Sequence, residues 1–139
     1  MNEKETQLMQ QLISLMSNPP YFEFESHSVV EEMKDCEDTS IFIEPIFRMM
    51  EAAPLFNFGS PGSLVHFIEA TDGYESKLIE SMQRSPSLHG LILLGRILNR
   101  FELKNKREYI NILKDIMQRA DVKPELSKAA SNMLNKHMS

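Results

Sequence analysis

Apolar residues recur at intervals of three and four along most of the chain, which is the spacing of one helix face. Between residues 3 and 17 this repeat includes Leu8, Leu12 and Met16, and two prolines then interrupt it. Similar repeats predict helices over 41–53, 61–71, 74–84, 86–101 and 105–120, and a last helix beginning at Pro124. Six or seven helices are expected to account for the chain.

The segment YFEFESHS, residues 21–28, has a different pattern. Apolar and acidic residues alternate in it for a few positions, which favours a short extended segment. Ser28 and Glu31 have the spacing of a capping box. A short helix is therefore expected to begin at Ser28 and to end near Cys36.

Two serine–proline pairs precede predicted helices. In FNFGSPGSLVHFIEATDG, residues 56–73, Ser60 is placed to cap a helix and Pro61 suits the first helical position. Ser85 and Pro86 repeat this arrangement before the next helix but one. The glycine-rich stretch around Ser60 is therefore interpreted as a helix start.

The predicted helix over 86–101 is apolar on nearly every side, so it is expected to be central in the fold. It contains Gly90 and Gly95 although glycine is a poor helix former, which indicates close packing against other helices. His89, in the same segment, is expected to be a hydrogen-bonded core histidine.

The fold class predicted by these patterns is all-α, with helices in antiparallel hairpins joined by short connections. Residues 61–84 and 86–120 have the form of two successive hairpins. Such pairs favour a HEAT-like stack, and an irregular helical bundle is the alternative. The length of 139 residues fits a single domain, 1–139.

Composition places the chain among ordinary globular proteins, with 42% hydrophobic and 25% charged residues. The longest apolar stretch, 91–98, is too short to cross a membrane and contains Arg96. The N-terminal residues lack the pattern of a secretory signal. Cys36 is the only cysteine, so no internal disulfide can form. We therefore expect a cytoplasmic protein without a membrane partner.

Acidic and basic residues are unevenly distributed along the chain. Residues 1–75 contain 14 acidic and 3 basic residues, whereas residues 76–139 contain 6 acidic and 12 basic residues. The two halves can attract each other within the fold, or the acidic half can present a face to a basic partner. The pattern leaves both explanations open.

Candidate catalytic and metal-binding patterns are weak. Ser60 or Ser63 with His66 and Asp72 lacks the spacing of a nucleophile elbow, and the surrounding loop lacks the lysine of a phosphate-binding loop. His66 and Glu69 form only one pair of possible metal ligands. We therefore expect no catalytic residue, no cofactor and no metal, and hence no enzyme.

Basic residues cluster around one predicted connection between helices, comprising Arg96, Arg100, Lys104, Lys106 and Arg107. This patch would tolerate phosphate groups. The chain as a whole is acidic and carries no recognisable nucleic-acid-reading motif. Direct nucleic-acid binding is therefore not expected.

The segment LFNFGSPGSLVHFIEATDGYESKLIESMQRSPSLHGLILLGRILN, residues 55–99, resembles a helical, HEAT-like family of bacterial immunity proteins from polymorphic toxin systems. Its most specific portions are FGSPGSLVHFIE and SPSLHGLILLGRILN. The resemblance implies that the chain binds and neutralises a cognate toxin domain, encoded beside it, in the bacterial cytoplasm. It implies no catalytic residues.

A surface for such a partner is predicted where acids and aromatics alternate. Many toxins of these systems, nucleases among them, carry basic clefts that an acidic face would attract and occlude. The alternative is a non-enzymatic helical adaptor or regulatory subunit with another protein partner. The predicted partner-binding residues are Tyr21, Phe22, Glu23, Phe24, Glu25, Glu31, Glu32, Asp35, Glu37, Asp38 and Glu44.

Overall fold

The computed structural model describes residues 1–59, 61–100 and 103–138, which form eight α-helices and no strand within those ranges. The all-α class is confirmed, and the helix count exceeds the expected six or seven. The helices are α1 (Glu3–Ser14), α2 (Phe22–Lys34), α3 (Ile43–Ala52), α4 (Gly62–Glu69), α5 (Tyr74–Arg84), α6 (Leu88–Leu98), α7 (Lys106–Gln118) and α8 (Pro124–Met138). Short 3-10 turns span Leu15–Ser17, Pro19–Tyr21 and Thr39–Phe42.

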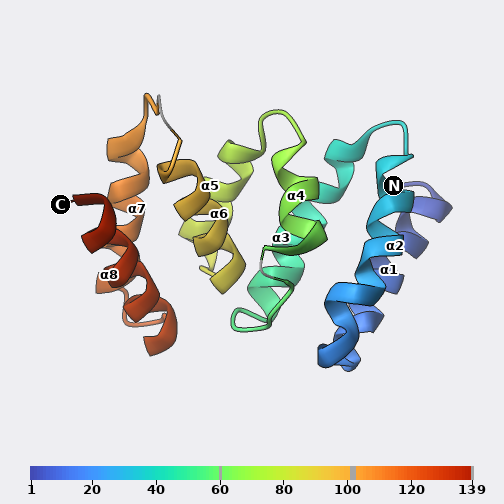
Figure 1. Ribbon diagram of the computed structural model, residues 1–139, viewed down its shortest axis with the longest axis horizontal. Coiled ribbons are helices and arrows are strands. Elements are labelled where there is room, and N and C mark those ends of the chain that lie inside the picture. Colours follow the sequence, from blue (N-terminus) through green and yellow to red (C-terminus); the bar gives the residue numbers. More distant parts are fainter. Residues whose placement is uncertain (60, 101–102, 139) are drawn as a thin grey trace.

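The helices follow one another in chain order along the long axis of the molecule, from the α1–α2 pair at one end to the α7–α8 pair at the other (Figure 1). Helices α2, α4, α6 and α8 lie nearer the viewer, with α1, α3, α5 and α7 behind them. Within pairs, the main contacts join α1 with α2, α5 with α6 and α7 with α8, and between neighbouring pairs they join α2 with α4, α3 with α5 and α6 with α8. One continuous hydrophobic core runs between these two rows.

Helix α2 differs from the sequence prediction, because it begins at Phe22 and includes the segment expected to be extended. Phe22 is fully buried and makes edge-to-face contacts with Phe56 and Phe58. Val30 and Met33 are buried on the same side of the helix. This buried stripe has helical spacing, and tertiary packing of its aromatic residue outweighs the local alternation of apolar and acidic residues.

His89 is a hydrogen-bonded core histidine, as predicted. Its Nε2 lies 2.9 Å from the carbonyl oxygen of Gly59, and its ring packs edge-to-face against Phe58. Burial lowers the pKa of His89, and the hydrogen bond to Gly59 opposes this shift only in part. A neutral imidazole that donates from Nε2 therefore ties the loop before α4 to α6.

The cap of α6 is Ser87 and not Ser85. The Ser87 hydroxyl accepts a hydrogen bond of 3.0 Å from the amide of Gly90, and the Ser87 side chain is buried. Ser85 has no cap contact of this kind, since its backbone closes the end of α5. Ser60, the other predicted cap, lies outside the described residues.

We expect Ser87→Ala to lower the free energy of unfolding by about 1 kcal/mol, because the Gly90 amide would lose its partner in a buried position. Urea unfolding followed by circular dichroism measures this difference. Ser85→Ala is the matched control and should change stability by less than about 0.5 kcal/mol. A larger loss in the control would contradict the assignment of the cap to Ser87.

Arginines of the second half bind carboxylates of the first half across neighbouring helices. Arg96 Nε lies 2.6 Å from Glu69, linking α6 to α4, and Arg100 Nη1 lies 3.0 Å from Glu75 at the start of α5. Part of the opposite charge of the two halves is thus used inside the fold. Exposed acids of the N-terminal end, such as Glu32 and Asp35, have no such arginine partner among the described residues.

Candidate functional site

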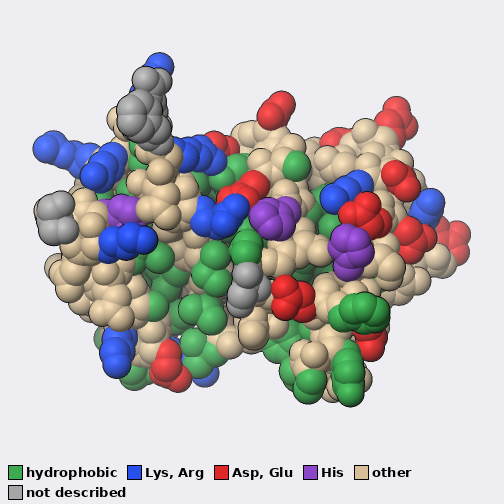
Figure 2. Space-filling view, in the orientation of Figure 1, with side chains coloured by type: hydrophobic (Ala, Val, Ile, Leu, Met, Phe, Trp, Pro, Cys, Tyr) green, Lys and Arg blue, Asp and Glu red, His purple; other side chains and the backbone are tan. Residues whose placement is uncertain are grey.

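The exposed side of α2, together with the turns at its two ends, carries most of the predicted partner-binding residues. Phe22, Ser26, Val29, Val30 and Met33 form the buried side of the helix. Phe24, Glu31 and Asp35 project from the opposite side, because they are offset from the buried stripe by about half a turn. In Figure 2 acidic side chains gather toward the N-terminal end and basic ones toward the C-terminal end.

We call the exposed members of the predicted set the acidic surface. It extends from the turn before α2, along the helix, and into the turn after it. The exposed residues are Tyr21, Glu23, Phe24, Glu25, Glu31, Glu32, Asp35, Glu37 and Asp38. Nine of the eleven predicted residues are thus exposed between residues 21 and 38.

Two predicted residues do not belong to this surface. Phe22 is fully buried among other aromatic rings, so it is a core residue and cannot contact a partner. Glu44 lies on α3, where it pairs with Arg48 at 3.1 Å and with Arg84 at 3.2 Å. Its charge is therefore largely compensated within the fold.

Few of the acids on the surface have a cationic neighbour. Glu31 is the exception, since its carboxylate accepts a 2.9 Å hydrogen bond from Lys34, and this contact lowers the Glu31 pKa. Asp38 accepts hydrogen bonds from the amide and hydroxyl of Ser40 and so caps the turn that follows. The acidic surface consequently keeps a strong negative potential.

Two aromatic side chains lie at the N-terminal end of α2, where the acidic surface begins. Phe24 is 84% exposed and Tyr21 is 57% exposed, an unusual placement for large apolar groups. Glu23 and Glu25 flank Phe24. We call these four residues the aromatic tip. Figure 2 shows hydrophobic side chains gathered at this end of the α1–α2 pair.

A solvent-open hollow of ≈ 710 Å³ adjoins the aromatic tip. Phe24 lines it from α2, Gln11 and Ser14 from α1, and Ser63 from α4. The hollow combines an apolar wall with hydroxyl, amide and carboxylate groups. It can therefore receive an apolar side chain and a polar or basic group from the same partner.

His27 and Ser63 were not predicted as neighbours, yet the imidazole Nδ1 lies 3.1 Å from the Ser63 hydroxyl. The other ring nitrogen lies 3.9 Å from Glu31, and the His27 side chain is 65% exposed. A serine nucleophile with its base works best where water is excluded. The exposed His27 side chain does not provide such an environment.

His66 and Glu69, the predicted metal pair, lie 3.8 Å apart, and Glu69 binds Arg96.

The predicted basic cluster is only partly accessible. The guanidinium groups of Arg96 and Arg100 are engaged by Glu69 and Glu75, and these carboxylates raise the arginine pKa values further. Lys104, Lys106 and Arg107 are exposed beyond them. The resulting basic area is smaller than the sequence indicates.

None of the helices in the described ranges is long and apolar enough to cross a bilayer. Nowhere in the same ranges do three histidine, cysteine or carboxylate side chains come together in a geometry that could hold a metal ion.

In comparisons with known proteins, no family model, no curated protein and no solved structure matched the chain.

Proposed function

We propose that this chain is an immunity-type binding protein, which neutralises a cognate bacterial toxin domain in the cytoplasm by covering its basic cleft. The observation that carries the proposal is the acidic surface, where exposed carboxylates surround exposed aromatic rings on one side of α2. Charge complementarity accelerates association and orients the partners. Buried aromatic contacts then slow dissociation.

The geometry supports occlusion in two ways. The acidic surface lies on a helix whose opposite side is anchored in the core, so its shape is fixed before binding. The adjoining hollow offers hydroxyl and amide groups that can replace the hydrogen bonds of a partner's polar side chains. We further propose that the paired helices form a HEAT-like stack, whose end pair presents this surface.

Charge reversal at Glu32 and Asp35 is expected to slow association with the product of the adjacent toxin gene. Glu32→Lys with Asp35→Lys should reduce the association rate about 10-fold at low salt and weaken its salt dependence. Stability should change little, because both side chains are exposed. Stopped-flow kinetics at two salt concentrations measures the rate.

The matched control reverses two exposed acids elsewhere, Glu80→Lys with Asp115→Lys, which gives the same change in net charge. Its association rate should stay within about 3-fold of the wild type. Equal slowing by both double variants would attribute the effect to net charge and would contradict a binding role for the acidic surface. Phe24→Ala should instead raise the dissociation rate by about 10-fold or more.

A further inference from the structure

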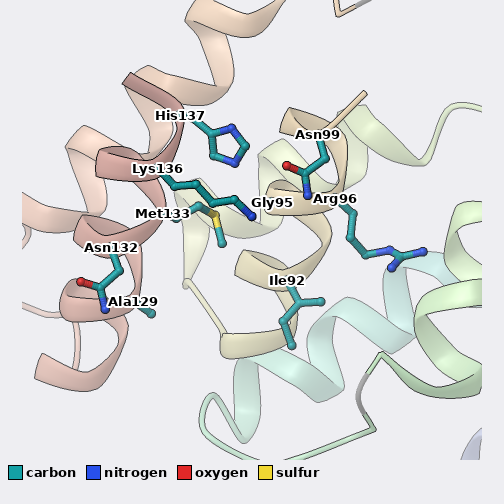
Figure 3. A pocket seen from close by; sticks show the side chains of 9 residues that line it. All are labelled: Ile92, Gly95, Arg96, Asn99, Ala129, Asn132, Met133, Lys136 and His137. Atoms are coloured by element: carbon teal, nitrogen blue, oxygen red, sulfur yellow. The ribbon is translucent and has the colours of Figure 1, made fainter. Parts of the chain in front are cut away.

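A second hollow lies between α6 and α8, at the opposite end of the molecule from the aromatic tip (Figure 3). It encloses ≈ 470 Å³ and is open to solvent. Ile92 and Gly95 line it from α6, and Ala129 and Met133 line it from α8. These four residues give it a mainly apolar lining large enough for one aromatic ring. We call it the α6–α8 hollow.

Basic residues surround the α6–α8 hollow. Lys136 and Arg96 line it directly, and each of them also interacts with another group of the chain. His137 borders both this hollow and a neighbouring one, whose other lining residues include Lys106, Arg107 and Lys114. Figure 2 shows Lys and Arg side chains gathered over this end.

The charge at this end comes from the lysines and arginines and not from His137. Partial burial, followed by the nearby Lys136 and Lys106, lowers the pKa of His137. The imidazole is therefore neutral at pH 7, while its basic neighbours stay charged. An approaching carboxylate meets a positive potential around an apolar opening.

The aromatic tip has the complementary chemistry. Its exposed Phe24 is flanked in sequence by two carboxylates, whereas basic residues border the apolar α6–α8 hollow. The two lie at opposite ends of the row of helices, so they cannot meet within one chain (Figure 1). They can meet between two copies.

We propose that the α6–α8 hollow receives the aromatic tip of a second copy of this chain, so that the protein associates head to tail. Phe24 enters the hollow against Ile92 and Met133, and Glu23 and Glu25 lie near Lys136 and the basic end of α7. The contact joins two different surfaces, so each added copy leaves one tip and one hollow available. Association continues into short open chains and does not stop at a symmetric dimer.

The experiment is sedimentation velocity on the full chain, without any other protein, from about 10 µM to about 1 mM. At about 0.02 M salt, the weight-average mass should rise above that of the monomer as concentration increases. At about 0.5 M salt the association should weaken at least 10-fold, since charged contacts are screened.

Two variants remove one side of the contact each. Phe24→Ser removes the ring, and Lys136→Glu places a negative charge at the hollow. Each is expected to weaken self-association at least 10-fold. The matched controls are Ile13→Ser, another exposed apolar side chain, and Lys128→Glu, on α8 but outside the hollow. Both controls should associate like the wild type.

Mixing the two variants gives a stricter test. One copy then has an intact hollow and the other an intact aromatic tip, so the mixture should form one-to-one dimers and nothing larger. A wild type that stays monomeric at about 1 mM overturns the proposal, and so does a mixture that fails to pair. Thermal melts identify a variant that has merely unfolded, and Lys136→Gln then serves in place of Lys136→Glu.

This proposal does not depend on toxin binding, and the two can fail separately. Self-association is measured without a toxin, and toxin binding is measured at concentrations where the chain is dilute. If both proposals hold, the toxin and the second copy compete for Phe24. Added toxin should then break the head-to-tail assemblies into single copies, each bound to toxin.

Discussion

Glu51→Ala is expected to lower the free energy of unfolding by about 3 kcal/mol at neutral pH, because it breaks a largely buried ion pair between α3 and α5. Both oxygens of Glu51 accept hydrogen bonds from Arg84, at 2.8 and 2.6 Å, and one also accepts from Ser81 at 2.8 Å. The Glu51 side chain is only 8% exposed, and Ser81 is fully buried. Urea unfolding at pH 7 measures the loss.

The control for this prediction is Glu44→Ala, since Glu44 also meets Arg84 but is 39% exposed. Solvent screens its interaction, so the loss should stay below about 1 kcal/mol. Similar losses in the two variants would mean that exposure does not govern the strength of this network.

The contribution of Glu51 should also depend on pH. Burial tends to raise its pKa from the ordinary value of 4.5, but the hydrogen bonds from Arg84 and Ser81 outweigh burial and lower it. The stabilisation is therefore fully present above the pKa of the unfolded chain and is lost as pH falls through that of the folded chain. The stability difference between wild type and Glu51→Gln should be largest at pH 7 and shrink below about pH 4.5. A difference that does not vary with pH would contradict this account.

Gly90→Val is expected to lower the free energy of unfolding by about 3 kcal/mol through overpacking. A Cβ atom at this position would meet the sulfur of Met82 and would lie 3.0 Å from the Ser87 hydroxyl that caps α6. Met82 is fully buried in the core, so it cannot move aside without disturbing its neighbours. Thermal and urea unfolding measure the loss.

Gly95→Val is the matched comparison within the same helix. Its Cβ would meet the terminal carbon of Met133 at 2.8 Å, but Met133 is a flexible side chain at the edge of the α6–α8 hollow. The methionine can rotate into the hollow, so the loss should be below about 1.5 kcal/mol. A larger loss for Gly95→Val than for Gly90→Val would show that the hollow is more rigid than the core beside α6.

The sequence predicted the helices whose apolar repeat is also their buried stripe. Helix α5 lies over 74–84 as predicted, and α8 begins at Pro124 as predicted. Helix α2 was missed at its start, because Phe22 and Phe24 alternate with glutamates although only Phe22 is buried. The spacing of Phe22, Val29, Val30 and Met33 carried the correct signal.

The candidate site, like the helices, was predicted only in part. The acids of α2 were identified because charge along a short segment is visible in sequence, whereas the burial of Phe22 depends on Phe56 and Phe58. The contact of His27 with Ser63 joins residues 36 positions apart, so no local pattern contains it. The same holds for the α6–α8 hollow, which depends on how two distant helices pack.

The row of helices in chain order has a consequence for local stability. Each inner pair has neighbours on both sides, whereas the α1–α2 pair has a neighbour on one side only. Backbone amides of a terminal pair are therefore expected to open and exchange with solvent at a lower free energy than those of α6. Because the acidic surface lies on this end pair, a bound partner would slow amide exchange most in α2.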